Sequence, residues 1–271
     1  MKRFLVIFLL LAACHPASSQ PGPVRVAVIG GMVMTGLWHQ IAEQFEKDTG
    51  CAVEVVVTGP KEIIAPAFRK GGIDLITFHS SDEATGLVAE GFATNMRPWT
   101  WNEHVIVGPE NDPAGIAGMT DGAAALRRIA ETGSRYVDAQ GGGKRLVAEK
   151  LWEAAGIRPV GDWVIKDESQ SSTDLLQFAQ TRHAYAICGR VPVLWKKIPS
   201  SGMKILVEGD PQMRRPFVVM EADPERFPEA RHREARLLAD YLTGPKGQAC
   251  LAAFVPAEGG AQPVFYPLEK R

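Results

Sequence analysis

The residues that could bind a ligand lie in four short segments, each at the end of an expected strand. The segments are 30–34, 59–62, 79–82 and 140–145. In an open α/β sheet, ligands bind outside the carboxyl ends of the strands. Two of the segments are rich in glycine and precede expected helices, where unpaired backbone N–H groups and the helix dipole attract an anion. The candidates for ligand contact are Gly30, Gly31, Met32, Lys61, His79, Ser80, Gly142, Gly143, Lys144 and Arg145.

Each segment also has a more ordinary explanation. Glycines occur in turns, exposed cations are solvated, and Ser80 stands at an expected helix start, where a serine caps the helix. A histidine such as His79 at a strand end commonly serves as a structural hydrogen-bonding group. Met32 and Met34 point to the same side of an extended segment, and their soft sulfur atoms suit Cu(I), but an apolar pocket wall or a core filler suits them better. Four such segments at repeated strand ends favour a binding cleft.

The sequence offers no set of residues that predicts catalysis. It has no G-x-S-x-G nucleophile elbow, and the segment 140–145 lacks the spacing of a phosphate-binding P-loop. His79 has no identifiable acidic partner. No C-x-x-C pair or Cys–His cluster indicates a structural zinc site. We therefore expect no catalytic residue, no metal and no cofactor.

The elements that must position these segments alternate between strand and helix. The apolar, β-branched run at 24–29 is typical of a strand that is buried on both faces, and further strands are expected at 53–58 and 74–78. Helical patterns follow them at 37–49, 62–70 and 79–91. Three strand–helix units in a row predict a parallel α/β sheet.

The middle of the chain repeats this α/β pattern and predicts a second lobe. A strand at 103–108 leads to the proline-rich segment 109–113, where we expect the chain to cross between lobes. Later elements are expected as helices at 121–132, 145–155, 191–197, 230–242 and 248–254, a helix starting near 171, and strands at 135–137, 184–188 and 216–220. Lobe one then comprises 24–108 plus 215–271, and lobe two comprises 109–214.

The first 23 residues predict export and a lipid anchor. Lys2 and Arg3 precede an apolar run at 4–11, which is far shorter than the roughly 20 residues of a transmembrane helix. Small residues follow at once, so residues 1–13 are expected to be a signal peptide. The run that ends at Cys14 resembles a bacterial lipobox, in which the cysteine is lipidated; a chance cysteine after an ordinary signal is the alternative. Residues 14–23 form the lipidated N-terminus and a flexible tether.

Charge and cysteine content narrow the function classes. The full chain has 30 basic and 31 acidic residues and no basic tail or stripe, which argues against nucleic-acid binding. Three cysteines remain after Cys14, an odd number that leaves at least one free thiol. We expect Cys51, Cys188 and Cys250 to be buried thiols, with a bridge between Cys51 and Cys250 as the alternative.

Several motifs along the chain resemble one known family. The stretches that carry the likeness are 45–47 with 49–50, 90–92, Asn95, 97–98, Asn102, 105–109, 111–116, 151–152 with 154–157, 161–163, 207–211, Pro245 with 247–248, and 265–267. Together they resemble the bacterial tungstate-binding proteins of the Tup type, the solute receptors of tungstate ABC importers. The resemblance runs from about residue 24 to Pro267. It implies a type II periplasmic-binding fold, in which two Rossmann-like lobes joined by a hinge close on a ligand.

The ligand motifs of that family are not retained. Its hydroxyl-rich run after the first strand is replaced by 29–32, its threonine in the second loop by Pro60, and its anion-clamping arginine by Ala139. His79 and Arg97 do match a family histidine and a family arginine. Each unreplaced charge-assisted hydrogen bond is worth roughly 1.5–3 kcal/mol. We therefore expect an anion that is larger than tungstate, or organic, held by backbone N–H groups and nearby cations.

The resemblance implies a receptor without catalytic activity. Its partners would be a small anionic solute, an ABC permease and its ATPase, and it would work as a monomer in the periplasm or cell envelope, tethered by Cys14. A sensory lipoprotein with the same fold, signalling ligand occupancy to a membrane partner, is the main alternative. Neighbouring permease and ATPase genes would favour import. A hydrolase built around His79 is the least supported hypothesis.

Overall fold

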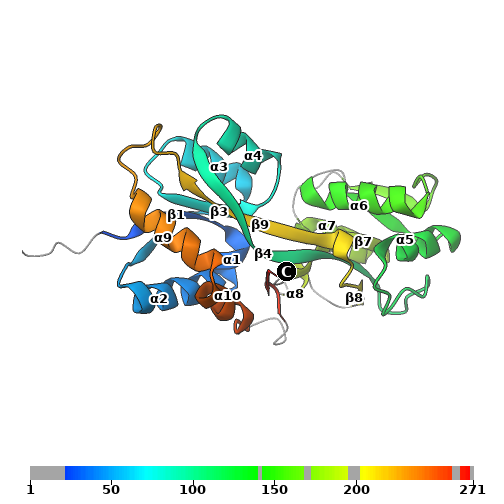
Figure 1. The fold of residues 1–271 in the computed structure, drawn as a ribbon. Helices are drawn as coiled ribbons and strands as arrows, with labels where there is room; N and C mark the ends of the chain where they lie inside the picture. The colour runs from blue at the N-terminus through cyan, green and yellow to red at the C-terminus, as the bar shows by residue number, and fades with distance from the viewer. Residues whose placement is uncertain (1–21, 140–141, 168–171, 195–201, 258–262, 269–271) are drawn as a thin grey trace, which may run out of the picture.

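A computed structural model describes residues 22–139, 142–167, 172–194, 202–257 and 263–268. Figure 1 shows two bodies, each a sheet with helices packed on it, connected by two long strands. We call the body that holds the N-terminal strands the proximal body and the other the distal body. The expected signal peptide and Cys14 lie outside the described residues.

The proximal body begins with the expected parallel strands. Strand β1 (Val24–Ile29) pairs in parallel with β2 (Val53–Gly59) and with β3 (Leu75–His79), which confirms the predicted parallel α/β arrangement. The helices of this body are α1 (Gly30–Met34), α2 (Leu37–Thr49), α3 (Lys61–Arg69), α4 (Asp82–Ala89), α9 (His232–Thr243) and α10 (Pro245–Ala252). Gly50 ends α2 with a φ of +72°, a left-handed conformation that favours glycine.

Two strands run through both bodies. Strand β4 (Ala93–Pro109) is 17 residues long and pairs antiparallel with β9 (Arg214–Ala222), which also pairs antiparallel with β3. The first ten residues of β4 were not expected to be a strand. Two register shifts, one of them next to Pro98, interrupt the pairing there. Such bulges spoil the regular alternation that identifies a strand in a sequence.

The distal body is built on the far half of β4. This half pairs antiparallel with β7 (Tyr185–Gly189) and β8 (Met203–Val207), while β5 (Tyr136–Ala139) pairs in parallel with β6 (Val164–Asp167) and β7. The remaining elements are α5 (Gly122–Glu131), α6 (Gly142–Ala155), α7 (Ser172–Thr181), α8 (Arg190–Leu194), a 3-10 turn (Pro211–Met213) and β10 (Tyr266–Pro267), which pairs with β4. Strands β6 and β8 were not expected from the sequence.

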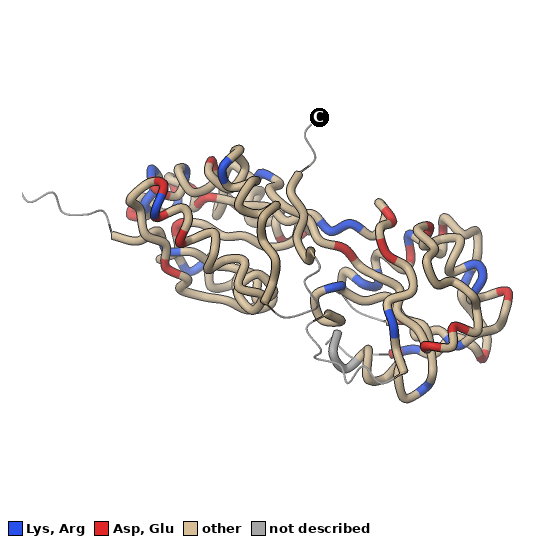
Figure 2. The backbone as a smooth tube through the Cα atoms, turned by 90° about the horizontal axis from the view of Figure 1, so that it is seen from below, with Lys and Arg blue, Asp and Glu red and all other residues tan. Residues whose placement is uncertain are grey.

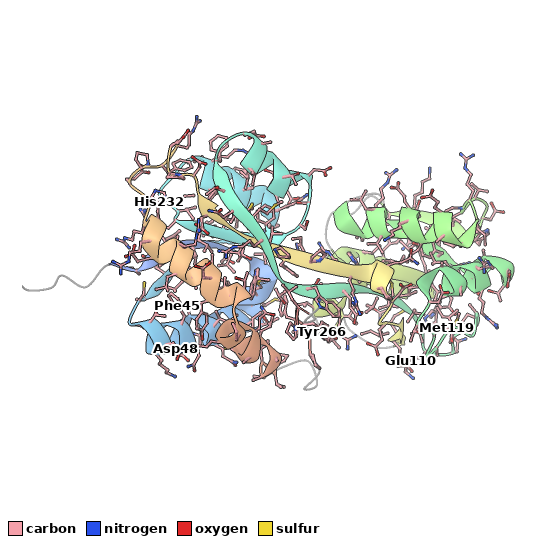
Figure 3. All side chains as sticks on the ribbon, in the orientation of Figure 1. Phe45, Asp48, Glu110, Met119, His232 and Tyr266 are labelled. Atoms are coloured by element: carbon pink, nitrogen blue, oxygen red, sulfur yellow. The ribbon has the colours of Figure 1, made fainter. Side chains whose placement is uncertain are left out.

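Each body has its own hydrophobic core. In the proximal core, Phe45 of α2 packs edge to face on Tyr241 of α9, with ring centroids 5.3 Å apart (Figure 3). The distal body contains two clusters, and these include Val105, Ile106 and Val107 of β4. Apolar burial therefore stabilises the two bodies separately, and the strands between them carry the connection.

The position where β4 changes body bears on the predicted lobe boundaries. Those boundaries placed residues up to 108 in lobe one, yet pairing with the distal strand β7 already begins at His104. We propose that the chain crosses near 102–104 and returns near 214–216. The predicted boundaries are otherwise kept as the working division.

Acidic and basic residues are interspersed along both bodies, as Figure 2 shows. Within the described ranges, no helix combines the length and apolar character that a bilayer span requires. The same residues contain no group of three or more His, Cys, Asp or Glu arranged to hold a metal. Cys51, Cys188 and Cys250 are free thiols, so the alternative bridge is not formed, and Cys250 is only half-buried.

Candidate functional site

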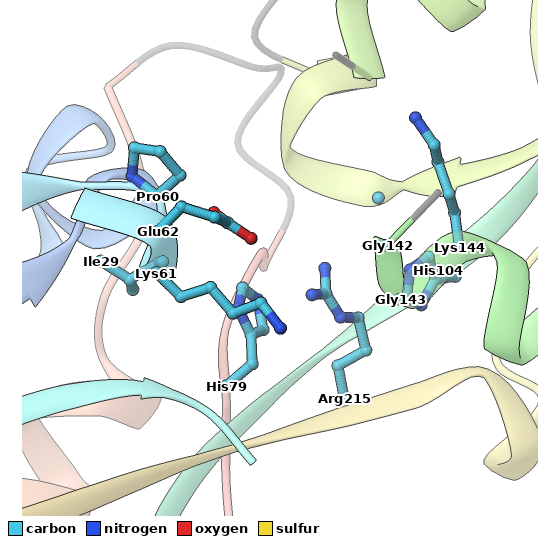
Figure 4. A pocket seen from close by; sticks show the side chains of 11 residues that line it. Ile29, Pro60, Lys61, Glu62, His79, His104, Gly142, Gly143, Lys144 and Arg215 are labelled. Carbon is cyan, nitrogen blue, oxygen red and sulfur yellow. The ribbon is translucent and has the colours of Figure 1, made fainter. Parts of the chain in front are cut away.

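A cleft lies where the two bodies meet. Its central compartment has a volume of about 240 Å³ and is formed by the carboxyl ends of β1, β3 and β7, the first turns of α3 and α6, and the crossing strands β4 and β9 (Figure 4). The lining residues are Ile29, Pro60, Lys61, Glu62, His79, His104, Gly142, Gly143, Lys144, Gly189 and Arg215. The cleft therefore lies at the strand ends where the sequence predicted it.

Two further compartments adjoin the central one and share His79 and Arg215 with it. The apolar compartment, of about 450 Å³, is lined by Ile29, Gly30, Gly31, Met34, His79, Asn102, Gly189, Val191, Pro192, Arg215, Phe217 and Phe265. The outer compartment, of about 510 Å³, is lined by Lys61, His79, Ser80, Ser81, Asp82, His104, Gly142, Gly143, Arg145, Leu146, Val147, Arg214, Arg215 and Pro216. His79 and Arg215 thus stand at the centre of the whole cleft.

Strand register explains how the polar side chains of the crossing strands converge. Asn102 of β4 lies directly opposite Arg215 of β9, and His79 of β3 lies directly opposite Phe217 of β9. Directly opposite residues share a face of the sheet, and so do residues two apart along a strand. Arg215 and Phe217 are two apart, and so are Asn102 and His104. These five side chains therefore project from one face, toward the cleft.

Arg215 is the principal cation of the cleft, and the sequence analysis missed it. It is half-buried and has no hydrogen-bond or ion-pair partner within the described part of the chain. Burial lowers its pKa from 12.5 to about 10, so the guanidinium remains charged at neutral pH. A Cβ added to Gly143 would lie 3.4 Å from Nη2 of Arg215, which places the first turn of α6 against the guanidinium.

No sequence signal singled out Arg215. It stands beside Arg214 and ahead of the apolar run of β9, where an ordinary solvated arginine is equally at home. Arg214 illustrates this, since its guanidinium lies over the ring of Trp101, 4.5 Å from the centroid. Only the pairing of β9 with β4 and β3 separates the two arginines.

Two histidines flank Arg215 in their neutral forms. Burial, together with the positive charge of Arg215, holds the pKa of His79 and that of His104 well below the ordinary value. The ring of His79 packs on that of Phe217, with centroids 4.2 Å apart. His104 is 2% exposed and hydrogen-bonds the backbone of Met213, while its Nδ1 atom is buried without a partner among the described residues. The N–H group of a neutral His79 can donate a hydrogen bond to an anion without adding a second charge.

The structure brings nine of the ten predicted contact residues to the cleft. Gly30 and Gly31 line the apolar compartment, Ser80 and Arg145 line the outer one, and Lys61, His79, Gly142, Gly143 and Lys144 line the central one. Their side chains differ in what they offer. Lys61 has no hydrogen-bond or ion-pair partner among the described residues and extends toward Arg215 in Figure 4. Arg145 is exposed and paired with Glu149 at 2.7 Å.

The side chain of Lys144 differs from that of Lys61 in its surroundings. It is 6% exposed, engaged in an interaction of its own, and directed away from Arg215 in Figure 4. Its backbone lies in the first turn of α6.

Met32 is the predicted contact that the structure places elsewhere. It is 0% exposed within the proximal core, whereas Met34 lines the apolar compartment. The expectation that the two point to the same side is wrong, because Gly30–Met34 is helical rather than extended. In a helix, residues two apart point in nearly opposite directions. Arg97, which matches a family arginine, instead pairs with Glu221 at 3.2 Å and Asp240 at 2.6 Å on the proximal body.

A comparison with known families identifies the class of protein. The family model described as bacterial extracellular solute-binding protein matches residues 24–254, most of the chain. The chain belongs to this family. The match spans the strands and helices of both bodies and includes the cleft residues from Ile29 to Arg215.

Individual members of the family are similar over most of the chain. A Haloferax volcanii protein, provisionally named an ABC transporter anion-binding protein, is 29% identical over 241 residues, which are 86% of this chain and 68% of that protein. The tungstate-binding protein TupA of Peptoclostridium acidaminophilum is 26% identical over 288 residues, covering 98% and 99%. The solved TupA structure from Desulfovibrio alaskensis G20 has a TM-score of 0.76 at 23% identity and covers 92% of this chain and 100% of that one. These matches confirm the resemblance to Tup-type proteins and the type II periplasmic-binding fold.

Proposed function

We propose that this extracellular solute-binding protein is the receptor of an ABC importer and binds a small anion in the cleft between its two bodies. The observation that carries the proposal is the guanidinium of Arg215, which has no partner among the described residues and lies half-buried at the centre of the cleft. A buried charge without a partner is unfavourable in the folded protein, so such a group is retained where a ligand supplies the opposite charge.

The surroundings of Arg215 complete an anion site. A guanidinium offers two parallel N–H donors to an oxyanion or a carboxylate, and each charge-assisted hydrogen bond contributes roughly 1.5–3 kcal/mol. Lys61 supplies a second positive charge in the same compartment. The first turns of α3 and α6 both line it, and their backbone N–H groups add favourable dipoles. Glu62 is the one acidic residue among the described lining residues of this compartment, and its side chain is exposed.

This set of groups replaces the hydroxyls and the arginine that the family carries in its ligand loops. The relatives in the comparison are named for tungstate and for anions, and a tetrahedral oxyanion such as tungstate or molybdate is one ligand class that Arg215 would accept. A larger organic anion is the other class. Both would place their negative charge against the same guanidinium.

Binding would draw the two bodies together. The cleft is lined from the proximal body by the start of α3 and from the distal body by the start of α6. An anion that contacts both helix starts favours the closed arrangement by its differential affinity for it. The crossing segments near 102–104 and 214–216 would act as the hinge, with proximal and distal lobes on either side.

The remaining parts of the proposal concern the setting of the receptor. Cleavage before Cys14 and lipidation of that residue would tether the protein to the cell envelope as a monomer. The closed, loaded receptor would then deliver its anion to a permease that is driven by a separate ATPase.

A thermal-shift screen of the purified protein tests the proposal. The panel comprises tungstate, molybdate, sulfate, phosphate, phosphonates and carboxylates. An anion present at about 100 times its dissociation constant adds about 2.7 kcal/mol to the stability of the folded protein. We expect at least one anion to stabilise the wild type and none to stabilise Arg215→Met. Arg158→Met is the matched control, because Arg158 is exposed and lies outside the cleft. A response that survives in Arg215→Met would contradict the proposal.

A further inference from the structure

The apolar compartment has a composition that a bare oxyanion does not need. Beyond Arg215 and His79, its walls include Met34, Val191 and Phe265. Its volume of about 450 Å³ exceeds that of the central compartment, which is about 240 Å³. Sites for organic small molecules have volumes of about 300–1,000 Å³ and mainly apolar walls with a few placed polar groups. This compartment fits that description.

The polar groups of the compartment gather at one end. Arg215 is the only cation among its described lining residues, and Asn102 lies directly opposite it on β4. Asn102 is 6% exposed, and its Oδ1 atom is buried without a hydrogen-bond partner in the described part of the chain. A buried polar atom without a partner costs about 1–3 kcal/mol, and a bound molecule with a donor group would remove that cost. The site thus has one charged end, one open hydrogen-bond acceptor and an apolar remainder.

Closure of the two bodies would not fill this compartment. Phe217, Phe265 and Val191 all belong to the proximal core, even though Val191 follows the distal strand β7. The rings of Phe217 and Phe265 pack at 5.6 Å between centroids, which holds that wall in place. None of its described lining residues comes from α6, the distal helix that would approach α3. The compartment therefore persists beside an anion held at Arg215.

We infer that the anion bound by this protein carries an apolar organic group, which lies in the apolar compartment while its charged group binds Arg215. The inference rests on the proposed function and specifies the class of its ligand. Tungstate, phosphate and other bare oxyanions would occupy only the charged end and leave the apolar walls unused.

Gly31 offers a direct way to test this inference. It lines the apolar compartment but neither of the others, and a Cβ added there meets nothing within 4 Å. A leucine side chain at this helical position would therefore extend into the compartment without a backbone clash. Gly86→Leu is the matched control, because Gly86 lies within α4, outside the cleft, and its added Cβ would meet only the end of Glu90.

The probes are phosphate, methylphosphonate, butylphosphonate and phenylphosphonate. Their affinities are measured by calorimetry on the purified protein. We expect the butyl or phenyl compound to bind the wild type about tenfold or more tightly than phosphate, because the added carbon atoms leave water. Gly31→Leu should remove this preference, so that the butyl and phenyl compounds bind no more tightly than phosphate. Gly86→Leu should retain the preference.

The possible failures can be told apart. Phosphate or tungstate binding through Arg215 without any gain from the apolar groups overturns the inference and leaves the proposed function intact. A gain that persists in Gly31→Leu also overturns the inference, because the organic group then lies elsewhere. If the wild type binds none of the anions, the proposed function and the inference are both overturned.

Discussion

Replacing Arg215 should have opposite effects on the stability of the ligand-free protein and on anion binding. The substitution Arg215→Met removes the guanidinium and keeps an unbranched apolar stem at the same position. Because no described residue pairs with Arg215, the ligand-free protein bears the desolvation cost of this charge. Arg215→Met should therefore stabilise the ligand-free protein while it abolishes the anion response.

The magnitude follows from the pKa of Arg215. Burial lowers this pKa from 12.5 to about 10. A shift of this size corresponds to roughly 3 kcal/mol, and solvent screening at the half-buried site reduces the expected gain to about 1–2 kcal/mol. The guanidinium is protonated in both the folded and the unfolded protein at pH 7.5, so the full cost is present there. The cost fades only as the pH rises above about 10, where the folded protein loses the proton first.

Thermal and urea unfolding at pH 7.5, without added anion, measure the effect. A gain of 1–2 kcal/mol should raise Tm by about 3–6 °C for a chain of this size. Arg158→Met removes an exposed arginine and should change stability by less than about 0.5 kcal/mol. The reasoning is refuted if Arg215→Met is destabilised by more than about 1 kcal/mol while Arg158→Met is neutral. That result would mean that Arg215 holds the protein structure together.

Three further substitutions test other parts of the structure. Asp74 is 0% exposed, and burial alone would raise its pKa, but hydrogen bonds from Arg25 outweigh this effect and lower the pKa. Asp74→Asn should therefore lower the free energy of unfolding by about 3 kcal/mol, measured in urea at pH 7. That cost should shrink in acid, as the wild type loses the contribution when the pH falls through the lowered pKa; a constant difference down to pH 2 would contradict it. Gly108→Ala places a Cβ 2.4 Å from the Tyr185 ring and should lower stability by about 1–3 kcal/mol; an unchanged urea midpoint would count against it. Glu62→Gln should tighten anion binding about fivefold at low salt in calorimetry, since it removes a like charge from the cleft, and weaker binding would argue against an anionic ligand.

Much of the proximal fold could be predicted from local pattern alone. The apolar runs at β1 and β3 are continuous because these strands are buried, and the glycines and polar residues between the strands mark the turns. Strand β2 lies at the edge of the sheet and is largely exposed, although its run of valines resembles the others. The positions of Gly30, Lys61, His79 and Gly142 at strand ends then predicted where a cleft would lie, because parallel strands end at one edge. These predictions needed only the order of elements along the chain.

Local pattern was insufficient where pairing partners lie far apart in the sequence. The first half of β4 contains register shifts and a proline, so its strand character depends on β9, more than 100 residues later. Met32 and Met34 were misjudged because a five-residue helix was taken for an extended segment. A difference of two residues means the same side in a strand and nearly opposite sides in a helix.

By itself, the sequence of this protein determined the α/β class, and it predicted a leader before Cys14 and a cleft at the strand ends. Only the tertiary structure decided which arginine lines the cleft. Arg214 and Arg215 are neighbours of the same type, yet one lies over Trp101 and the other reaches the cleft beside Gly143. Alternate residues of a strand point to opposite faces, and the face that becomes a binding site is set by the strands that pair with it.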